Sequence, residues 1–145
     1  MGDKIAILYP SITMALLTLT LVLTMGARRF VSVRRRSVSV TYYRTYDEGT
    51  GEPRSLRQHS RHVQNHFELP PLFHLAVLLT FLVGSVDRTA LIAAWLFVVL
   101  RCVHSAIHLT YNNVSHRFFA YGSGVLTVLF LWGRLLLTLA STTAP

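Results

Sequence analysis

Three polar residues share one face of a helix predicted for the middle of the chain. Arg61, Asn65 and Glu68 follow one another at spacings of four and three residues, which places their side chains on the same side of an α-helix. That face offers a cation, an amide and a carboxylate. Two roles fit such a face: ligand binding, or an intrahelical network in which the three groups satisfy one another.

A second polar face follows in a later apolar stretch. It consists of Arg101, His104, His108 and Tyr111, and Arg117 and Tyr121 stand one turn apart at the start of the next predicted helix. Charges within apolar spans usually face the interior of a helix bundle, so we expect these faces and the first one to converge there. Arg61, Arg101 and Arg117 against one carboxylate leave an excess of positive charge, which predicts an anion site.

Other chemistries fit these residues less well. His104 and His108 have the i, i+4 spacing that can bind a metal, but no HExxH pattern is present and no carboxylate shares their face. We therefore expect hydrogen bonding and no metal there. Cys102 lies on a different face, where packing is its expected role. Gly122 and Gly124 predict a helix–helix contact surface.

These polar residues lie within or next to long apolar runs of the sequence, and helices formed by those runs must position them. We predict one membrane domain over residues 1–145, an all-α transmembrane four-helix bundle, with spans at about 5–26, 62–84, 89–111 and 118–140. The second helix is expected to begin near Arg61 and to be kinked or re-aimed by Pro70 and Pro71. The alternatives are a buried re-entrant segment for the second run and a cleaved signal peptide for the first.

Composition and charge support this class and orient the spans. Of the 145 residues, 52% are hydrophobic and 14% charged, yet the formal net charge is +8. The large apolar share excludes a disordered tail, and the single cysteine excludes a disulfide-stapled domain. Most arginines lie in a loop over about 27–60, whose middle (TYDEGTGEPRS) is expected to be a flexible turn. The positive-inside rule places this loop in the cytoplasm and both termini outside. The loop is expected to contact anionic lipid and, lacking a recognition motif, no nucleic acid.

Two stretches of the chain resemble a known membrane family. They are RHVQNHFELPPLF (61–73) and RCVHSAIHLTYNNVSHRFFAY (101–121), and they are similar to the MAPEG family, the membrane-associated proteins in eicosanoid and glutathione metabolism. The Arg-x-x-x-Asn-x-x-Glu face is the family's most telling pattern, and the histidine-rich stretch ending in His116-Arg117 resembles its bacterial branch. The resemblance implies a homotrimer in a bacterial inner membrane, with periplasmic termini and glutathione bound between subunits at the cytoplasmic end.

The same resemblance implies roles for individual residues. Those matched by position to glutathione contacts are Arg29, Arg61, Gln64, Asn65, Glu68, His104, His108 and Tyr121. Glu68 would pair with the amino group and the arginines with the carboxylates. Arg117 matches the arginine that stabilises the thiolate and is therefore the implied catalytic residue. A guanidinium beside a thiol, whose ordinary pKa is about 8.5, favours the nucleophilic thiolate.

The function implied is that of a glutathione-dependent transferase or peroxidase acting on a lipophilic electrophile dissolved in the bilayer. Three departures from prostaglandin E synthase-like members argue against a specific eicosanoid isomerase: Gln64 replaces an arginine, Phe118 a serine and His108 a tyrosine. The alternative is a non-catalytic trimeric membrane module. Its polar faces would be structural, and its basic loop would bind anionic lipid.

Overall fold

The computed structural model of the protein describes residues 2–46, 49 and 51–143. Within these residues all regular structure is helical, which confirms the predicted all-α fold. The helices are α1 (Gly2–Ile5), α2 (Leu8–Arg34), α3 (Tyr42–Thr45), α4 (Arg54–Glu68), α5 (Pro70–Leu82), α6 (Arg88–Leu109) and α7 (Val114–Thr143).

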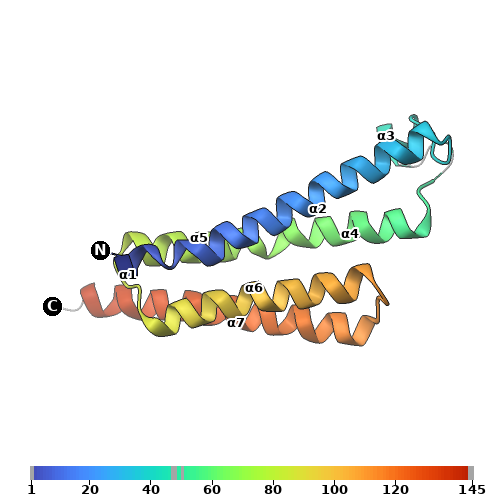
Figure 1. Ribbon diagram of the computed structural model, residues 1–145. Helices are drawn as coiled ribbons and strands as arrows, with labels where there is room; N and C mark the ends of the chain where they lie inside the picture. The colour runs from blue at the N-terminus through green and yellow to red at the C-terminus, as the bar shows by residue number, and fades with distance from the viewer. Residues whose placement is uncertain (1, 47–48, 50, 144–145) are drawn as a thin grey trace.

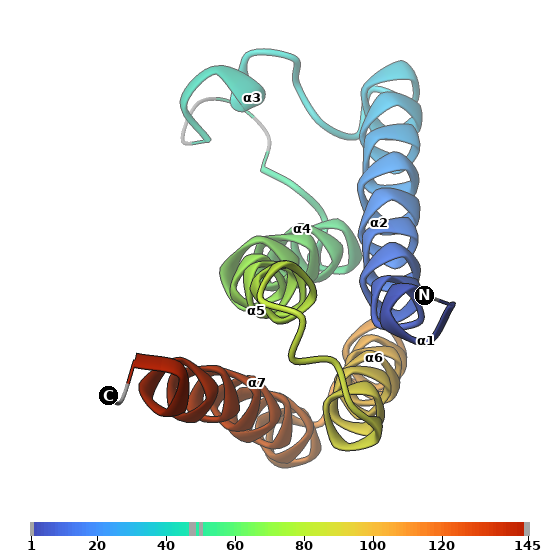
Figure 2. The same cartoon turned by 90° about the vertical axis from the view of Figure 1, so that its left-hand side faces the viewer.

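The long helices run alongside one another in alternating directions and form a bundle (Figure 1). α4 and α5 follow each other along one rod, while α2, α6 and α7 are single rods. Both chain ends lie at one end of the bundle, and the α2–α4 and α6–α7 connections lie at the other (Figure 1). The view along the rods shows them grouped around a shared interior, with α3 set away from it (Figure 2).

In the part of the chain that the structure describes, three helices are long and apolar enough to cross a membrane: Leu8–Arg34, Arg88–Leu109 and Val114–Ser141. The rod between the first two of these is divided, because α4 ends at Glu68 and α5 begins at Pro70. Proline has no amide hydrogen, and its ring clashes with the carbonyl of the preceding turn. The prolines were expected to kink or re-aim one helix, and in the structure they divide it into two.

The loop between α2 and α4 is shorter than expected. The sequence suggested a loop over 27–60 and a second helix starting near Arg61, but α2 continues to Arg34 and α4 begins at Arg54. Pro53 stands in extended conformation directly before α4, a position where its fixed φ costs the helix nothing. Asp47, Glu48 and Thr50, from the expected flexible turn, lie outside the described residues.

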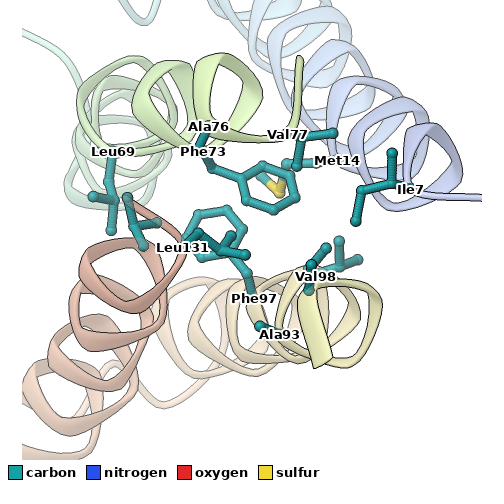
Figure 3. Close-up of a cluster of buried hydrophobic side chains, with 13 residues drawn as sticks. Ile7, Met14, Leu69, Phe73, Ala76, Val77, Ala93, Phe97, Val98 and Leu131 are labelled. Carbon is teal, nitrogen blue, oxygen red and sulfur yellow. The ribbon is translucent and has the colours of Figure 1, made fainter. Parts of the chain in front are cut away.

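An apolar core fills the half of the bundle nearer the termini (Figure 3). The rings of Phe73 on α5 and Phe97 on α6 stack with 4.3 Å between their centroids. Met14 of α2 and Leu131 of α7 are buried in the same cluster. Lipid tails are as apolar as these side chains, so in a bilayer the core stabilises the bundle through close packing.

Asp87 fixes the start of α6. Its carboxylate accepts a hydrogen bond from the Ala90 amide at 2.7 Å, the usual N-cap contact. The other carboxylate oxygen accepts from Arg134 of α7 at 2.5 Å. The hydrogen bond from Ala90, with a smaller contribution from Arg134, lowers the pKa of this carboxyl. One exposed residue therefore caps α6 and ties it to α7 near the termini.

Candidate functional site

The half of the bundle away from the termini is polar, and α4 supplies histidines to its interior. His59, His62 and His66 are buried, whereas Arg61 and Glu68 are exposed. The sequence predicted that the Arg61–Asn65–Glu68 face would turn into the bundle, and this prediction was wrong. The three histidines and the Arg61–Asn65–Glu68 face both have helical spacing. Burying a neutral imidazole, however, costs far less free energy than burying a guanidinium or a carboxylate.

The polar face of α6 does point inward, as predicted. Arg101, His104 and His108 are all at most 2% exposed, whereas Cys102, on another face, is exposed. Tyr111 was expected to extend this face and does not. α6 ends at Leu109, so Tyr111 is no longer in phase with the helix; its side chain is 61% exposed and hydrogen-bonds His116.

Arg101 is enclosed by aromatic rings and a glycine. Its guanidinium carbon lies 4.7 Å from the ring centroid of Tyr121 and 5.1 Å from that of Phe97. A Cβ at Gly124 would lie 3.1 Å from its Nη2. Gly124 therefore contributes to the contact surface expected there, because its lack of a side chain leaves room for Arg101. Arg101 is fully buried and lines neither of the two clefts described next, contrary to the anion site predicted from the sequence.

A cleft of about 390 Å³ opens on the outside of the bundle, and we call it the outer cleft. It is lined by Asn65, Glu68, His104, Val114, Arg117, Phe118 and Tyr121. α4 contributes the amide and the carboxylate, α6 the imidazole, and the first turns of α7 the guanidinium and the phenol. The structure thus brings five of the predicted site residues to one place.

A second cavity of about 280 Å³, the arginine pocket, is lined by Arg54, Arg57, Gln58, Arg61, His108, Asn112 and Arg117. Among the residues that the structure describes, its lining carries four guanidinium groups and no carboxylate, a composition that favours anions. Arg54 and Arg57 were not among the predicted site residues, because the sequence suggested a loop at these positions. Their spacing to Arg61, three and four residues, matches one face of a helix.

Arg117 lines both the outer cleft and the arginine pocket. Its Nη1 donates to Asn112 Oδ1 at 2.6 Å and to His108 Nε2 at 3.2 Å. Its backbone carbonyl lies 3.3 Å from Nδ1 of His104. Asn112 has a φ of 51°, a left-handed conformation that asparagine tolerates well. The turn between α6 and α7 therefore holds this guanidinium in a defined place.

Arg29 and Gln64 lie elsewhere. They line a third cleft of about 370 Å³, together with Met25, Tyr46, Arg57, Ser60, Arg61 and Val63. Arg29 donates to Glu52 at 2.9 Å and to Ser60 at 3.0 Å. The carboxylate of Glu52 is buried, so the pair joins the end of α2 to the start of α4. Within one protomer, Arg29 is thus engaged in a structural ion pair.

His59 connects α4 to α2 near the same end. Arg28 Nη1 donates to its Nδ1 at 3.1 Å, and its Nε2 lies 3.1 Å from the carbonyl oxygen of Leu21. A guanidinium only donates and a carbonyl only accepts, so the ring is neutral, with its proton on Nε2.

No curated protein shows a significant match to the chain. A family model, described as MAPEG family, matches residues 7–137 and thereby covers every residue of the outer cleft and the arginine pocket. The match spans most of the chain and agrees with its membrane-length helices and with the polar end of the bundle. On these grounds the chain belongs to the MAPEG family.

Proposed function

We propose that the protein is a glutathione-dependent transferase or peroxidase that acts on lipophilic electrophiles in the membrane. Membership of the MAPEG family implies glutathione-related chemistry in general terms. The observation that supports the finer proposal is the outer cleft, where Asn65, Glu68, His104, Arg117 and Tyr121 line one space. These residues come from three helices, and the family resemblance assigns each of them to glutathione or its thiolate.

The charges of the two cavities complement those of glutathione, which carries two carboxylates, one ammonium group and one thiol. Of the described residues that line the outer cleft, Glu68 alone carries a carboxylate, and it is the proposed partner of the ammonium group. The arginine pocket offers guanidinium groups for the carboxylates. Arg117 belongs to both cavities, so a ligand spanning them would place its central part beside this residue.

Arg117 is the proposed catalytic residue. A free thiol has a pKa of about 8.5, and each unit by which that pKa falls corresponds to about 1.4 kcal/mol. A guanidinium remains protonated at all physiological pH values and favours the thiolate, so the thiol proton passes to solvent. The thiolate then attacks an electrophilic carbon: a carbon–sulfur bond forms, and on a chlorinated ring the carbon–chlorine bond breaks with release of chloride. Phe118, 70% exposed, gives the cleft an apolar wall.

We also propose a homotrimer, with the outer cleft completed by a neighbouring subunit. Arg61, Gln64 and Glu68 face outward from the bundle. Polar and charged residues within a membrane-spanning rod are costly when they face lipid, and a second subunit would cover them. Lipids and a lipophilic substrate are the other proposed partners.

The proposed location is a bacterial inner membrane, with the α4–α5 rod as the remaining span. Both termini lie at the same end of the bundle (Figure 1), as an even number of crossings requires. The arginine-rich connection between α2 and α4 lies at the other end. The positive-inside rule then places that end in the cytoplasm and the termini in the periplasm.

The test is conjugation of glutathione to a chlorinated nitroaromatic by purified protein in detergent. Replacing Arg117 with alanine is expected to lower turnover by about 100-fold, the factor that corresponds to a two-unit shift of the thiol pKa. Arg88→Ala removes the same charge at the opposite end of the bundle and should leave turnover unchanged. Equal turnover in wild type and Arg117→Ala would remove Arg117 from the mechanism. An inactive wild type would favour the non-catalytic module.

A further inference from the structure

Three histidines from two helices meet inside the bundle. His62 comes from α4, and His104 and His108 stand one turn apart on α6. Each of the three histidines has one ring nitrogen that lies within 4.8 Å of the corresponding nitrogens of the other two. The three side chains are 0%, 2% and 2% exposed. This group, the histidine cluster, is buried by its own protomer and does not depend on a neighbouring subunit.

The cluster contains polar atoms that the described part of the chain leaves without a hydrogen-bond partner. They are both ring nitrogens of His62, Nε2 of His104 and Nδ1 of His108. Buried polar groups in proteins are nearly always partnered, and each exception indicates an unfilled interaction. Each histidine of the cluster carries at least one such atom, and the three rings come from two helices within reach of a single ion.

The protonation of His104 suits a metal ligand. Its Nδ1 lies 3.3 Å from the carbonyl oxygen of Arg117, and because a carbonyl only accepts, Nδ1 carries the proton. Nε2 is then left with a free lone pair. Histidines that bind metals typically donate their other N–H to a carbonyl or carboxylate in this way, which fixes the tautomer and the orientation of the ring.

We propose that His62, His104 and His108 bind a transition metal ion of the kind that neutral imidazole prefers, with Zn²⁺ as the reference case. Three imidazoles leave a fourth coordination position open, as in zinc sites with three protein ligands. With Zn–N distances of about 2.1 Å, tetrahedral ligand atoms stand about 3.4 Å apart. Binding therefore draws the three rings closer together than the present 4.8 Å limit.

Arg117 competes with the metal for His108. The guanidinium donates to Nε2 of this ring at 3.2 Å, which leaves the ring proton on Nδ1. A metal at Nε2 displaces the guanidinium directly. A metal at Nδ1 moves the proton to Nε2, which can then no longer accept from Arg117. The hydrogen bond and the metal bond therefore exclude each other, and removal of Arg117 should tighten metal binding.

The test is a titration of tag-free, chelator-treated wild-type protein with Co²⁺ in detergent, followed by displacement with Zn²⁺. No glutathione is present, so the outcome is independent of the proposed catalytic activity. We expect one equivalent per chain, with the visible absorption of a four-coordinate cobalt site. Arg117→Ala should bind about tenfold more tightly, a typical size for effects on residues that contact metal ligands.

Two histidine variants locate the site. His62→Gln should abolish the cobalt absorption. The matched control, His74→Gln, changes a histidine on α5 that hydrogen-bonds Ser11 and should leave the absorption intact. Absence of the band in folded wild type overturns the proposal, whether or not His62→Gln folds. An unchanged absorption band in His62→Gln, or weaker cobalt binding in Arg117→Ala, would also overturn the proposal.

Discussion

The guanidinium of Arg101 occupies the space that a side chain at Gly124 would need. The Cβ of any residue at position 124 would stand 3.1 Å from Nη2 of Arg101, closer than ordinary van der Waals contact. Arg101 has little room to move away, because its guanidinium also lies over the rings of Phe97 and Tyr121. The buried guanidinium of Arg101 therefore fits into the bundle because position 124 on α7 carries no side chain.

Replacing Gly124 with alanine should therefore destabilise the protein. Alanine favours a helix by about 1 kcal/mol over glycine, but the clash with Arg101 should outweigh that gain. Gly122 is the matched control, since a Cβ there meets nothing within 4 Å, and Gly122→Ala should be neutral or stabilising. Thermal unfolding in detergent measures both variants. An equal or higher melting temperature for Gly124→Ala than for Gly122→Ala would contradict the packing described for Arg101.

The Arg29–Glu52 pair should contribute to stability whether or not a ligand is bound. Glu52→Gln keeps the shape of the side chain but leaves Arg29 without its anionic partner, and hydrogen bonds to charged groups contribute about 1.5–3 kcal/mol. We expect a lower melting temperature by an amount that glutathione does not change. A loss seen only in the presence of glutathione would instead indicate that Arg29 serves the ligand.

Stability should fall as the pH drops below about 6.5, the ordinary pKa of histidine. His59 accepts a hydrogen bond from Arg28 and is therefore neutral in the folded protein, so the unfolded chain takes up a proton first. The contribution of this hydrogen bond is complete above the ordinary pKa of histidine and is lost as the pH falls and the ring becomes protonated. Melting temperatures at several pH values should show a weaker dependence for His59→Gln than for wild type. An identical dependence in the two proteins would rule out His59 as a source of this effect.

The sequence predicted those features that depend on helical periodicity alone. The inward face of α6, with Arg101, His104 and His108, follows from a 3.6-residue period in an apolar helix. The division between α4 and α5 follows from the chemistry of Pro70. Both are local rules, and both hold in the structure.

The features that the sequence did not predict depend on tertiary choices. α4 carries two polar faces with equally good spacing, and only packing against α2 and α6 decides that His62, and not Arg61, is buried. The lower cost of burying neutral imidazole would have favoured that choice. Arg29 lies on α2 and Glu52 lies in the connection before α4. No periodic pattern in the sequence reveals a contact between two such segments.

Glutathione binding at the outer cleft is measured by a thermal shift with glutathione, in detergent, for wild type and Glu68→Gln. The amide preserves the size of the side chain and removes the charge proposed to hold the glutathione ammonium group. A ligand that binds only the folded state stabilises it by about 2.7 kcal/mol at 100 times its Kd. We expect a clear rise in the melting temperature of wild type and a much smaller rise in Glu68→Gln. Equal melting temperatures of wild type with and without saturating glutathione would contradict this expectation.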